Sequence, residues 1–224
     1  MSERSFLFRS ALVTGGASGI GAAAVAALEA EGCEVVSLDL SDGFDVADAA
    51  AWEDVGAVDF AFLNAGVSTG VGDVAELDDE RYRRAVGANV DGVVYGTRRM
   101  AQVMTPGSAI VATASLAGLM PLSFDPIYTL TKHAVVGFVR AVAPQLAGRR
   151  ITINALCPGF ADTPIIPTEL RELVVAQSVP LIAAETVAAA ALTAARSGET
   201  GQAWVVQPGR EPLVYAFRGV PGPR

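Results

Sequence analysis

Short apolar runs alternate with longer segments of helical pattern along this 224-residue chain. Helices are predicted over 20–31, over 78–104, from about Tyr128 onward and over 185–196. The runs typical of strands are 8–14, 34–40, 58–66, 108–115, 151–159 and 202–209. Strands that are apolar on both faces and alternate with helices indicate a parallel sheet that is covered on both sides. The pattern therefore predicts a Rossmann-type, doubly wound α/β fold.

The length predicts a single domain over residues 1–224. Only the five residues 40–44 separate Asp39 from Asp45, which is too short for a helical crossover between parallel strands. We therefore expect the fold to be shortened between the second and third strands. We also expect residues 163–182 to form a lid segment. Residues 210–224 are rich in Pro and Gly and are expected to form an irregular tail.

The composition excludes several classes of function. With 51% hydrophobic residues the chain is not disordered, and its net charge of −8 argues against nucleic-acid binding. One histidine and two separated cysteines are too few for a zinc site, so we expect no metal. The sequence shows neither a signal-peptide cleavage site nor an apolar stretch of membrane-spanning length, which favours a soluble, cytoplasmic protein without a membrane partner.

A glycine-rich segment, TGGASGIG, follows the first predicted strand and precedes the first helix. Gly15, Gly19 and Gly21 permit a tight turn close to a pyrophosphate, and a helix N-terminus supplies N–H donors to it. The same turn also occurs in ordinary strand-to-helix connections. Asp39 ends the second strand, where a carboxylate binds ribose hydroxyls and repels a 2′-phosphate. NAD is therefore favoured over NADP.

Tyr128 and Lys132 lie four residues apart at the start of a predicted helix and share one face of it. A nearby ammonium favours the phenolate, so we expect the pKa of Tyr128 to fall below its ordinary value of about 10. Ser115 closes a strand before this helix, and its hydroxyl is able to hold a substrate oxygen. By itself the Tyr-x-x-x-Lys spacing is also typical of a solvated helix face.

The combination of motifs is more specific than any one of them. TGGASGIG, NAG at 64–66, Asn89, Ser115, YTLTK at 128–132 and PGFADT at 158–163 occur in this order. In this the chain resembles the short-chain dehydrogenase/reductase family over nearly its whole length. SLAGLMPLSFDPIYTLTKHAVVGFVR and ALCPGFADT resemble its hydroxyprostaglandin dehydrogenase branch, which oxidises a lipid secondary alcohol with NAD.

The resemblance assigns a role to each matching position. It implies that Asn89, Ser115, Tyr128 and Lys132 are catalytic, with Asn89 anchoring a proton-relay water. Leu63 departs from the Asn-Asn-Ala-Gly that is usual in the family. The cofactor-binding residues implied are Gly15, Ser18, Ile20, Gly21, Asp39, Leu40, Asp45, Val46, Asn64, Ala65, Gly66, Tyr128, Lys132, Pro158, Gly159, Ala161 and Thr163.

These observations predict an NAD-dependent oxidoreductase that moves a hydride between the cofactor and a secondary alcohol or ketone, with Tyr128 as acid/base. The alternatives are a ketoreductase that works mainly in the reducing direction and a non-catalytic dinucleotide sensor. The family further implies a homodimer or homotetramer. The substrate is expected to be hydrophobic, because the segments flanking the site contain Leu119, Met120, Leu122, Phe124, Ile165, Ile166, Leu170, Leu173 and Val174.

Overall fold

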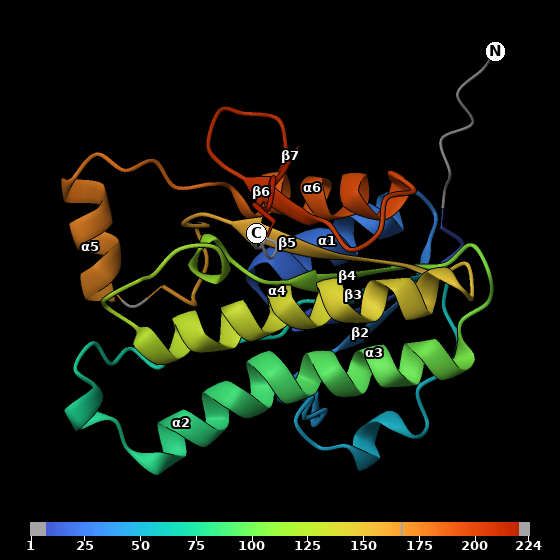
Figure 1. Cartoon of the computed structure of the whole chain (residues 1–224), viewed down its shortest axis with the longest axis horizontal. Helices are drawn as coiled ribbons and strands as arrows, with labels where there is room; N and C mark the ends of the chain where they lie inside the picture. Colours follow the sequence, from blue (N-terminus) through green and yellow to red (C-terminus); the bar gives the residue numbers. More distant parts are fainter. Residues whose placement is uncertain (1–7, 167, 220–224) are drawn as a thin grey trace, which may run out of the picture.

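The computed structural model describes residues 8–166 and 168–219, and a seven-stranded sheet runs through its middle (Figure 1). The strand order is β2-β1-β3-β4-β5-β6-β7; the first six strands are parallel and β7 is antiparallel to β6. The strands are β1 Ser10–Thr14, β2 Glu34–Leu38, β3 Phe60–Leu63, β4 Ala109–Thr113, β5 Thr152–Pro158, β6 Ala203–Val206 and β7 Leu213–Val214.

Helices cover both faces of this sheet, and β3 shows the reason. Its alternate residues Phe60 and Phe62 are buried in the core that includes α1 and α6, and Ala61 and Leu63 are buried in the core that includes α3 and α4. The predicted doubly wound α/β fold is thereby confirmed. The helices are α1 Gly19–Ala30, α2 Asp79–Val86, α3 Gly92–Val103, α4 Pro126–Ala147, α5 Thr168–Ala176 and α6 Ala184–Arg196.

The fold is shortened between β2 and β3, as predicted. Two 3-10 turns, Leu40–Asp42 and Ala50–Trp52, replace a crossover helix, and β2 is left as the edge of the sheet. The buried ring of Trp52 joins the core on this side, and its Nε1 donates a hydrogen bond to the Val46 carbonyl oxygen at 3.0 Å. One large aromatic side chain therefore contributes part of the cover that a crossover helix supplies elsewhere in the sheet.

Two elements differ from the prediction. The helix expected over 78–104 is interrupted by a π-helical turn, Gly87–Asp91, between α2 and α3. The tail is not irregular throughout, because β7 pairs with β6 and the Tyr215 amide donates to the Ala203 carbonyl oxygen. This pairing gives β6 a neighbour on its outer side. Residues 220–224 of the expected tail lie outside the described residues.

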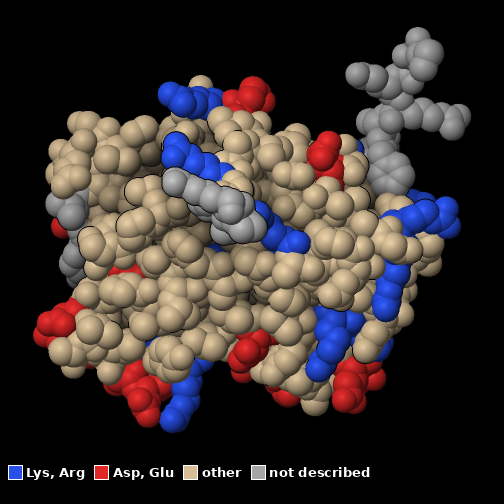
Figure 2. All heavy atoms as spheres, viewed as in Figure 1, with Lys and Arg blue, Asp and Glu red and all other residues tan. Residues whose placement is uncertain are grey.

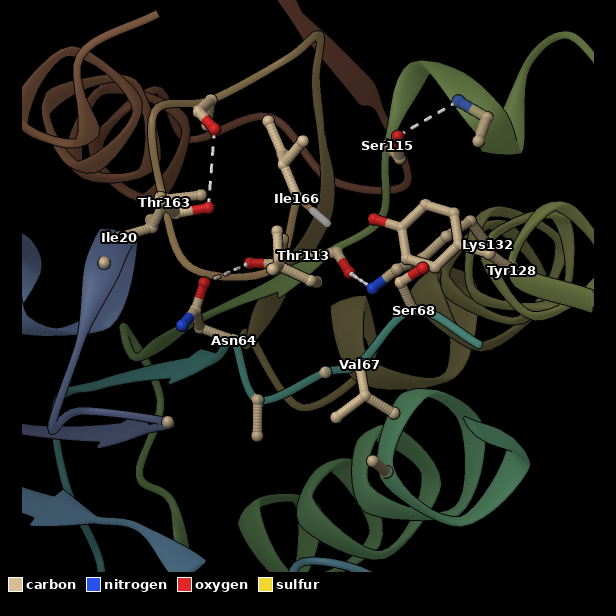
Figure 3. A pocket seen from close by; sticks show the side chains of 18 of the residues that line it. Ile20, Asn64, Val67, Ser68, Thr113, Ser115, Tyr128, Lys132, Thr163 and Ile166 are labelled. Atoms are coloured by element: carbon tan, nitrogen blue, oxygen red, sulfur yellow. Dashed lines mark hydrogen bonds between the residues drawn. The ribbon is translucent and has the colours of Figure 1, made fainter. Parts of the chain in front are cut away.

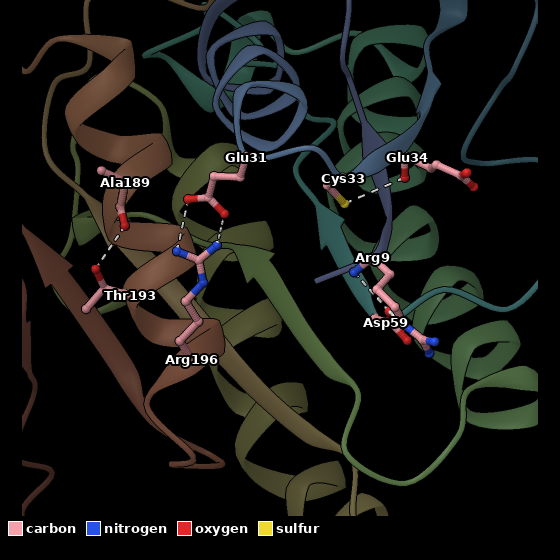
Figure 4. Close-up of polar contacts among 8 residues, drawn as sticks. All are labelled: Arg9, Glu31, Cys33, Glu34, Asp59, Ala189, Thr193 and Arg196. Atoms are coloured by element: carbon pink, nitrogen blue, oxygen red, sulfur yellow. Dashed lines mark hydrogen bonds and ion pairs between the residues drawn. The ribbon is translucent and has the colours of Figure 1, made fainter. Parts of the chain in front are cut away.

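Polar contacts hold the sheet and helices together at the end opposite the glycine-rich loop. Arg196 and Glu31 form an ion pair that joins the carboxyl ends of α6 and α1 (Figure 4). At the same end, the Arg9 amide donates to the Asp59 carboxylate at 3.0 Å and ties the start of β1 to the start of β3. The contact between Arg9 and Asp59 lies at the amino ends of β1 and β3, and the carboxyl ends of the strands lie at the opposite edge of the sheet.

On the face drawn in Figure 2, charged side chains lie mainly at the margins. In Figure 2, acidic and basic side chains gather along the lower edge, over α2 and α3, whereas the middle of this face is mostly uncharged. Within the described residues, none of the helices has the length and apolar character needed to cross a membrane.

Candidate active site

The carboxyl ends of the parallel strands open into a cavity of about 760 Å³. In an open α/β sheet this edge is where ligands bind. Two of the predicted site residues, Gly21 and Asn89, lie outside the cavity lining. The predicted residues that line it are Gly15, Ser18, Ile20, Asp39, Leu40, Asp45, Val46, Asn64, Ala65, Gly66, Ser115, Tyr128, Lys132, Pro158, Gly159, Ala161 and Thr163.

The glycine-rich loop has the shape of a phosphate cradle. Gly15 and Gly19 have φ angles of +67° and +52°, which side chains disfavour. A Cβ atom at Gly21 would lie 1.9 Å from the Gly15 carbonyl oxygen, so Gly21 acts by letting the loop pack on α1. Ser18 precedes α1 without capping it through its side chain, which leaves the first-turn N–H groups available to an anion. These residues fit a dinucleotide pyrophosphate.

Asp39 lies directly after β2 and borders this loop. Its carboxylate accepts hydrogen bonds from the Ser41 amide at 3.0 Å and from the Ala17 amide at 3.1 Å. The hydrogen bond from the Ser41 amide is the main reason why the pKa of Asp39 lies below its ordinary value. The cavity therefore contains a fixed negative charge at the end of β2 near neutral pH.

Hydrogen bonds hold the predicted cofactor-binding residues Asp45, Val46 and Asn64 in place. Asp45 accepts a hydrogen bond from the Ala47 amide at 2.9 Å, and Val46 is held by its bond from Trp52. Asn64 donates to the Thr14 carbonyl oxygen at 3.3 Å and accepts from the Thr113 hydroxyl at 3.1 Å. The loop after β3 is thereby tied to both neighbouring strands.

Leu63 stands where the family usually has a polar residue. Its side chain is buried beside Gly96, where an added Cβ would lie 2.7 Å from Leu63 Cδ2. Leu63 therefore packs against α3 at a position where the family usually has a polar side chain.

Ser115, Tyr128 and Lys132 converge on one part of the cavity (Figure 3). The Ser115 side chain lies near enough to the Tyr128 hydroxyl to lower the pKa of Tyr128. The Lys132 ammonium is buried, lies 5.4 Å from the centroid of the Tyr128 ring and donates to the Thr113 carbonyl oxygen at 2.8 Å. The arrangement places two hydroxyl groups and one cation where a substrate oxygen can be bound.

The expectation that Lys132 lowers the pKa of Tyr128 is wrong for this structure. Burial raises the pKa of Tyr128 to about 12, although the Ser115 side chain lowers it, and the charge of Asp125 raises it further. Burial also lowers the pKa of Lys132 to about 8. Burial of the phenol therefore outweighs the effect expected of Lys132, whose ammonium donates to the Thr113 carbonyl oxygen.

Asn89 lies in the π-helical turn and supports the site from behind. Its Oδ1 accepts a hydrogen bond from the Val67 amide at 2.8 Å, and its Nδ2 donates to the Val67 carbonyl oxygen and to the Thr131 hydroxyl. The side chain thus links the loop after β3 to α4. Its predicted function as a water anchor stays a prediction.

The end of the cavity beyond Tyr128 is largely apolar. The rings of Phe124 and Phe160 stack there with their centroids 6.1 Å apart. Met120, Leu122, Ile165, Ile166 and Leu170 also line the cavity, as the sequence predicted. Leu119 does not line it, Val174 is buried outside the lining, and the side chain of Leu173 lies outside the described residues.

Several lining residues were not predicted. Phe160 lies inside the recognised PGFADT segment, and the loop 67–70 directly follows the NAG motif, so proximity to these motifs was the available signal. Arg84 and Ala88 come from α2 and the π-helical turn, and only the tertiary fold brings them to the cavity.

Comparison with known proteins places this site in a family. A family model described as enoyl-(acyl carrier protein) reductase matches residues 39–209. A solved short-chain dehydrogenase/reductase, the glucose/ribitol dehydrogenase from Brucella melitensis, superimposes with a TM-score of 0.81. The two chains are 26% identical, and the match covers 90% of this chain and 96% of that one. This chain belongs to the short-chain dehydrogenase/reductase family.

Two relatives indicate the chemistry found among similar short-chain dehydrogenases/reductases. The 15-hydroxyprostaglandin dehydrogenase [NAD(+)] of Bos taurus is 32% identical over 199 residues, which is 72% of this chain and 71% of the relative. The 3beta-hydroxysteroid dehydrogenase of Mediterraneibacter gnavus is 37% identical over 150 residues, which is 65% of this chain. That match spans 54% of the relative, about half of its length. Both relatives are dehydrogenases named for a hydroxyl group.

Proposed function

We propose that this chain is an NAD-dependent oxidoreductase that transfers a hydride between the cofactor and a hydrophobic secondary alcohol or ketone. The observation that carries the proposal is the grouping of Tyr128 and Ser115 beside the buried Lys132, in one cavity with a glycine-rich loop. When bound, NAD supplies the ring that accepts the hydride and a positive charge that favours the phenolate form of Tyr128.

The protein side of the proposed reaction is a proton transfer. The substrate oxygen binds between the Tyr128 and Ser115 hydroxyls, and Tyr128 takes the proton from an alcohol or gives it to a ketone. Ser115 holds the same oxygen as its charge develops. Lys132 keeps a positive charge near the ring and fixes α4 to β4 through its bond to Thr113.

The proposed preference for NAD over NADP is supported by Asp39. Its low pKa keeps the carboxylate charged, and a negative charge at the end of β2 repels a 2′-phosphate. A bovine relative is also named as NAD-dependent. Gly15, Ser18 and the first turn of α1 would hold the pyrophosphate.

A hydrophobic substrate is supported by the apolar end of the cavity, where Phe124 and Phe160 stack beside Ile165 and Leu170. Such a surface gains free energy by contact with hydrocarbon and offers few partners to a sugar's hydroxyl groups. The ring alcohol in the name of the hydroxysteroid relative is consistent with this class.

The ketoreductase alternative uses the same site. Tyr128 would then donate its proton to the ketone oxygen. The same residues serve both directions, so the direction depends on the cofactor supplied. The sensor alternative is disfavoured because binding alone does not require Ser115 and Tyr128 to be grouped beside a buried Lys132.

We also propose a homo-oligomer in which α4 packs against a second copy. The mostly uncharged middle of the face in Figure 2 lies over α4, whose outward residues include the small side chains Ala134, Gly137 and Ala141. Small residues permit close approach of helices, and light scattering coupled to gel filtration measures the number of copies.

The proposed function is tested with a panel of secondary alcohols and ketones, each offered with NAD(H) and NADP(H). Absorbance of the reduced nicotinamide reports turnover. We expect turnover of cyclic or aryl alcohols with NAD, and slower turnover with NADP. Absence of turnover in either direction, with NADH binding retained, would support the sensor alternative instead.

A further inference from the structure

Asp125 is a buried carboxylate at the edge of the proposed site. It is 2% exposed, lines the cavity and directly precedes α4. In the described part of the chain, no ion pair involves it. A buried acid without a cation is costly unless hydrogen bonds compensate it. The structure must therefore provide those bonds.

Five hydrogen bonds converge on this carboxylate from two separate segments. Oδ1 accepts from the Tyr128 amide at 2.9 Å and from the Thr69 hydroxyl at 2.6 Å. Oδ2 accepts from the Ser68 hydroxyl at 2.7 Å, the Thr69 amide at 2.8 Å and the Gly70 amide at 3.2 Å. Because so many donors occupy its lone pairs, Asp125 is not free to act as a base.

The bonds connect the loop after β3 to the first turn of α4. Tyr128 lies in that first turn, where the amide groups have no partner within the helix. Ser68 lines the cavity near Tyr128 and Lys132 in Figure 3. A single side chain therefore sets the position of the Tyr128 backbone relative to a neighbouring wall of the cavity.

We propose that Asp125 is a positioning residue of the reaction: its carboxylate fastens loop 68–70 to the amino end of α4 and so fixes the backbone from which Tyr128 reaches Ser115. This inference rests on the proposed function of Tyr128. Misplacement of a reacting group by about 1 Å is enough to reduce turnover by about 10²-fold.

The negative charge of Asp125 adds a second effect. It raises the pKa of Tyr128, as does Cys157 from β5, and the Ser115 hydroxyl lowers it. The positive charge that faces the ring is the Lys132 ammonium on α4, 5.4 Å from the ring centroid. Removal of the Asp125 charge should therefore lower the pKa of Tyr128.

The main test replaces Asp125 by serine and uses Asp78 as a matched control. Asp125→Ser keeps a hydroxyl that can cap α4 but loses the charge and the connection to the loop. Asp78 caps α2 through its bond from the Arg81 amide, 2.7 Å, and lies outside the cavity lining, so Asp78→Ser removes a comparable cap elsewhere.

Two readouts separate positioning from simple stability. Carbon-13 labelling of the tyrosine ring, assigned with Tyr128→Phe, gives the pKa of Tyr128 by NMR without any turnover. Steady-state kinetics give kcat and KM. For Asp125→Ser we expect the pKa to fall from about 12, kcat to fall about tenfold or more, and NADH binding to persist. Asp78→Ser should change neither the pKa nor kcat.

A result in which Asp125→Ser lowers only the melting temperature, with the pKa of Tyr128 and kcat unchanged, would overturn the proposal. If Asp125→Ser does not fold, the double variant Ser68→Ala, Thr69→Val decides. It keeps the carboxylate and its bond from Tyr128 but removes two loop hydroxyls, and it should lower kcat; an unchanged kcat contradicts the proposal.

If the wild type turns over no alcohol or ketone, the proposed function fails, and the NMR titration still measures the effect of Asp125.

Discussion

The ammonium of Lys132 lies one helical turn from Tyr128, 5.4 Å from the centroid of its ring, and donates to the carbonyl oxygen of Thr113, 2.8 Å away. Thr113 ends β4, so this bond fixes α4 to the sheet at the point where Tyr128 faces the cavity. The proposed chemistry depends on keeping a cation in a buried position, although burial lowers its pKa to about 8.

Replacing Lys132 by methionine should stabilise the protein and abolish turnover. The pKa of Lys132 falls from 10.5 to about 8 on folding, which corresponds to a cost of about 3 kcal/mol below pH 8. The unfolded chain binds more protons between these values, so the wild type gains stability as pH rises from about 8 to about 10.5.

After about 1 kcal/mol is subtracted for the lost hydrogen bond, Lys132→Met should be more stable than the wild type by about 2 kcal/mol at pH 7. The difference should shrink or reverse near pH 10. Urea unfolding at both pH values measures it. A variant that is clearly less stable at pH 7 would show that the buried ammonium stabilises the fold.

Gly21→Ala should prevent tight dinucleotide binding, because its Cβ would lie 1.9 Å from the Gly15 carbonyl oxygen and force the loop away from α1. Gly56→Ala is the matched control, since no atom outside the adjoining residues lies within 4 Å of its added Cβ. NADH fluorescence titration should show affinity lowered about tenfold or more for Gly21→Ala and unchanged for the control. Equal affinities would place the pyrophosphate elsewhere.

Asp39→Asn should weaken the preference for NAD over NADP. The asparagine side chain lacks the charge that repels a 2′-phosphate. Its NH2 group also faces one of the two backbone N–H donors, that of Ala17 or that of Ser41, and cannot accept a hydrogen bond from it. We expect the ratio of kcat/KM for NAD to that for NADP to fall about tenfold. A ratio equal to that of the wild type would mean that other groups, such as Arg84 in the cavity lining, determine the choice.

Much of the fold follows from local patterns. The apolar runs predicted the parallel sheet because each of its inner strands is buried on both faces, as at Phe60 to Leu63. The short segment after Asp39 predicted the missing crossover. The patterns did not show that Trp52 covers the gap, nor that β7 pairs with β6, because both depend on contacts between segments distant in the sequence.

The site was predicted less evenly. The motifs identified many of the residues that line the cavity, because most of these lie near the end of a strand or the start of a helix. It gave the wrong direction for the pKa of Tyr128, because spacing shows the nearby cation but not the depth of burial. Asp125 was missed because its donors, Ser68, Thr69 and Gly70, lie in a loop far away in the sequence.

The most direct test compares Tyr128→Phe with Tyr82→Phe, a control on the exposed surface of α2. Removal of the one hydroxyl that exchanges the substrate proton should reduce kcat by about 10³-fold and leave the dissociation constant for NADH unchanged. Tyr82→Phe should behave as the wild type. If Tyr128→Phe turned over alcohols or ketones at the wild-type rate, the proton would have to move through another group, and the proposed function of Tyr128 would be wrong.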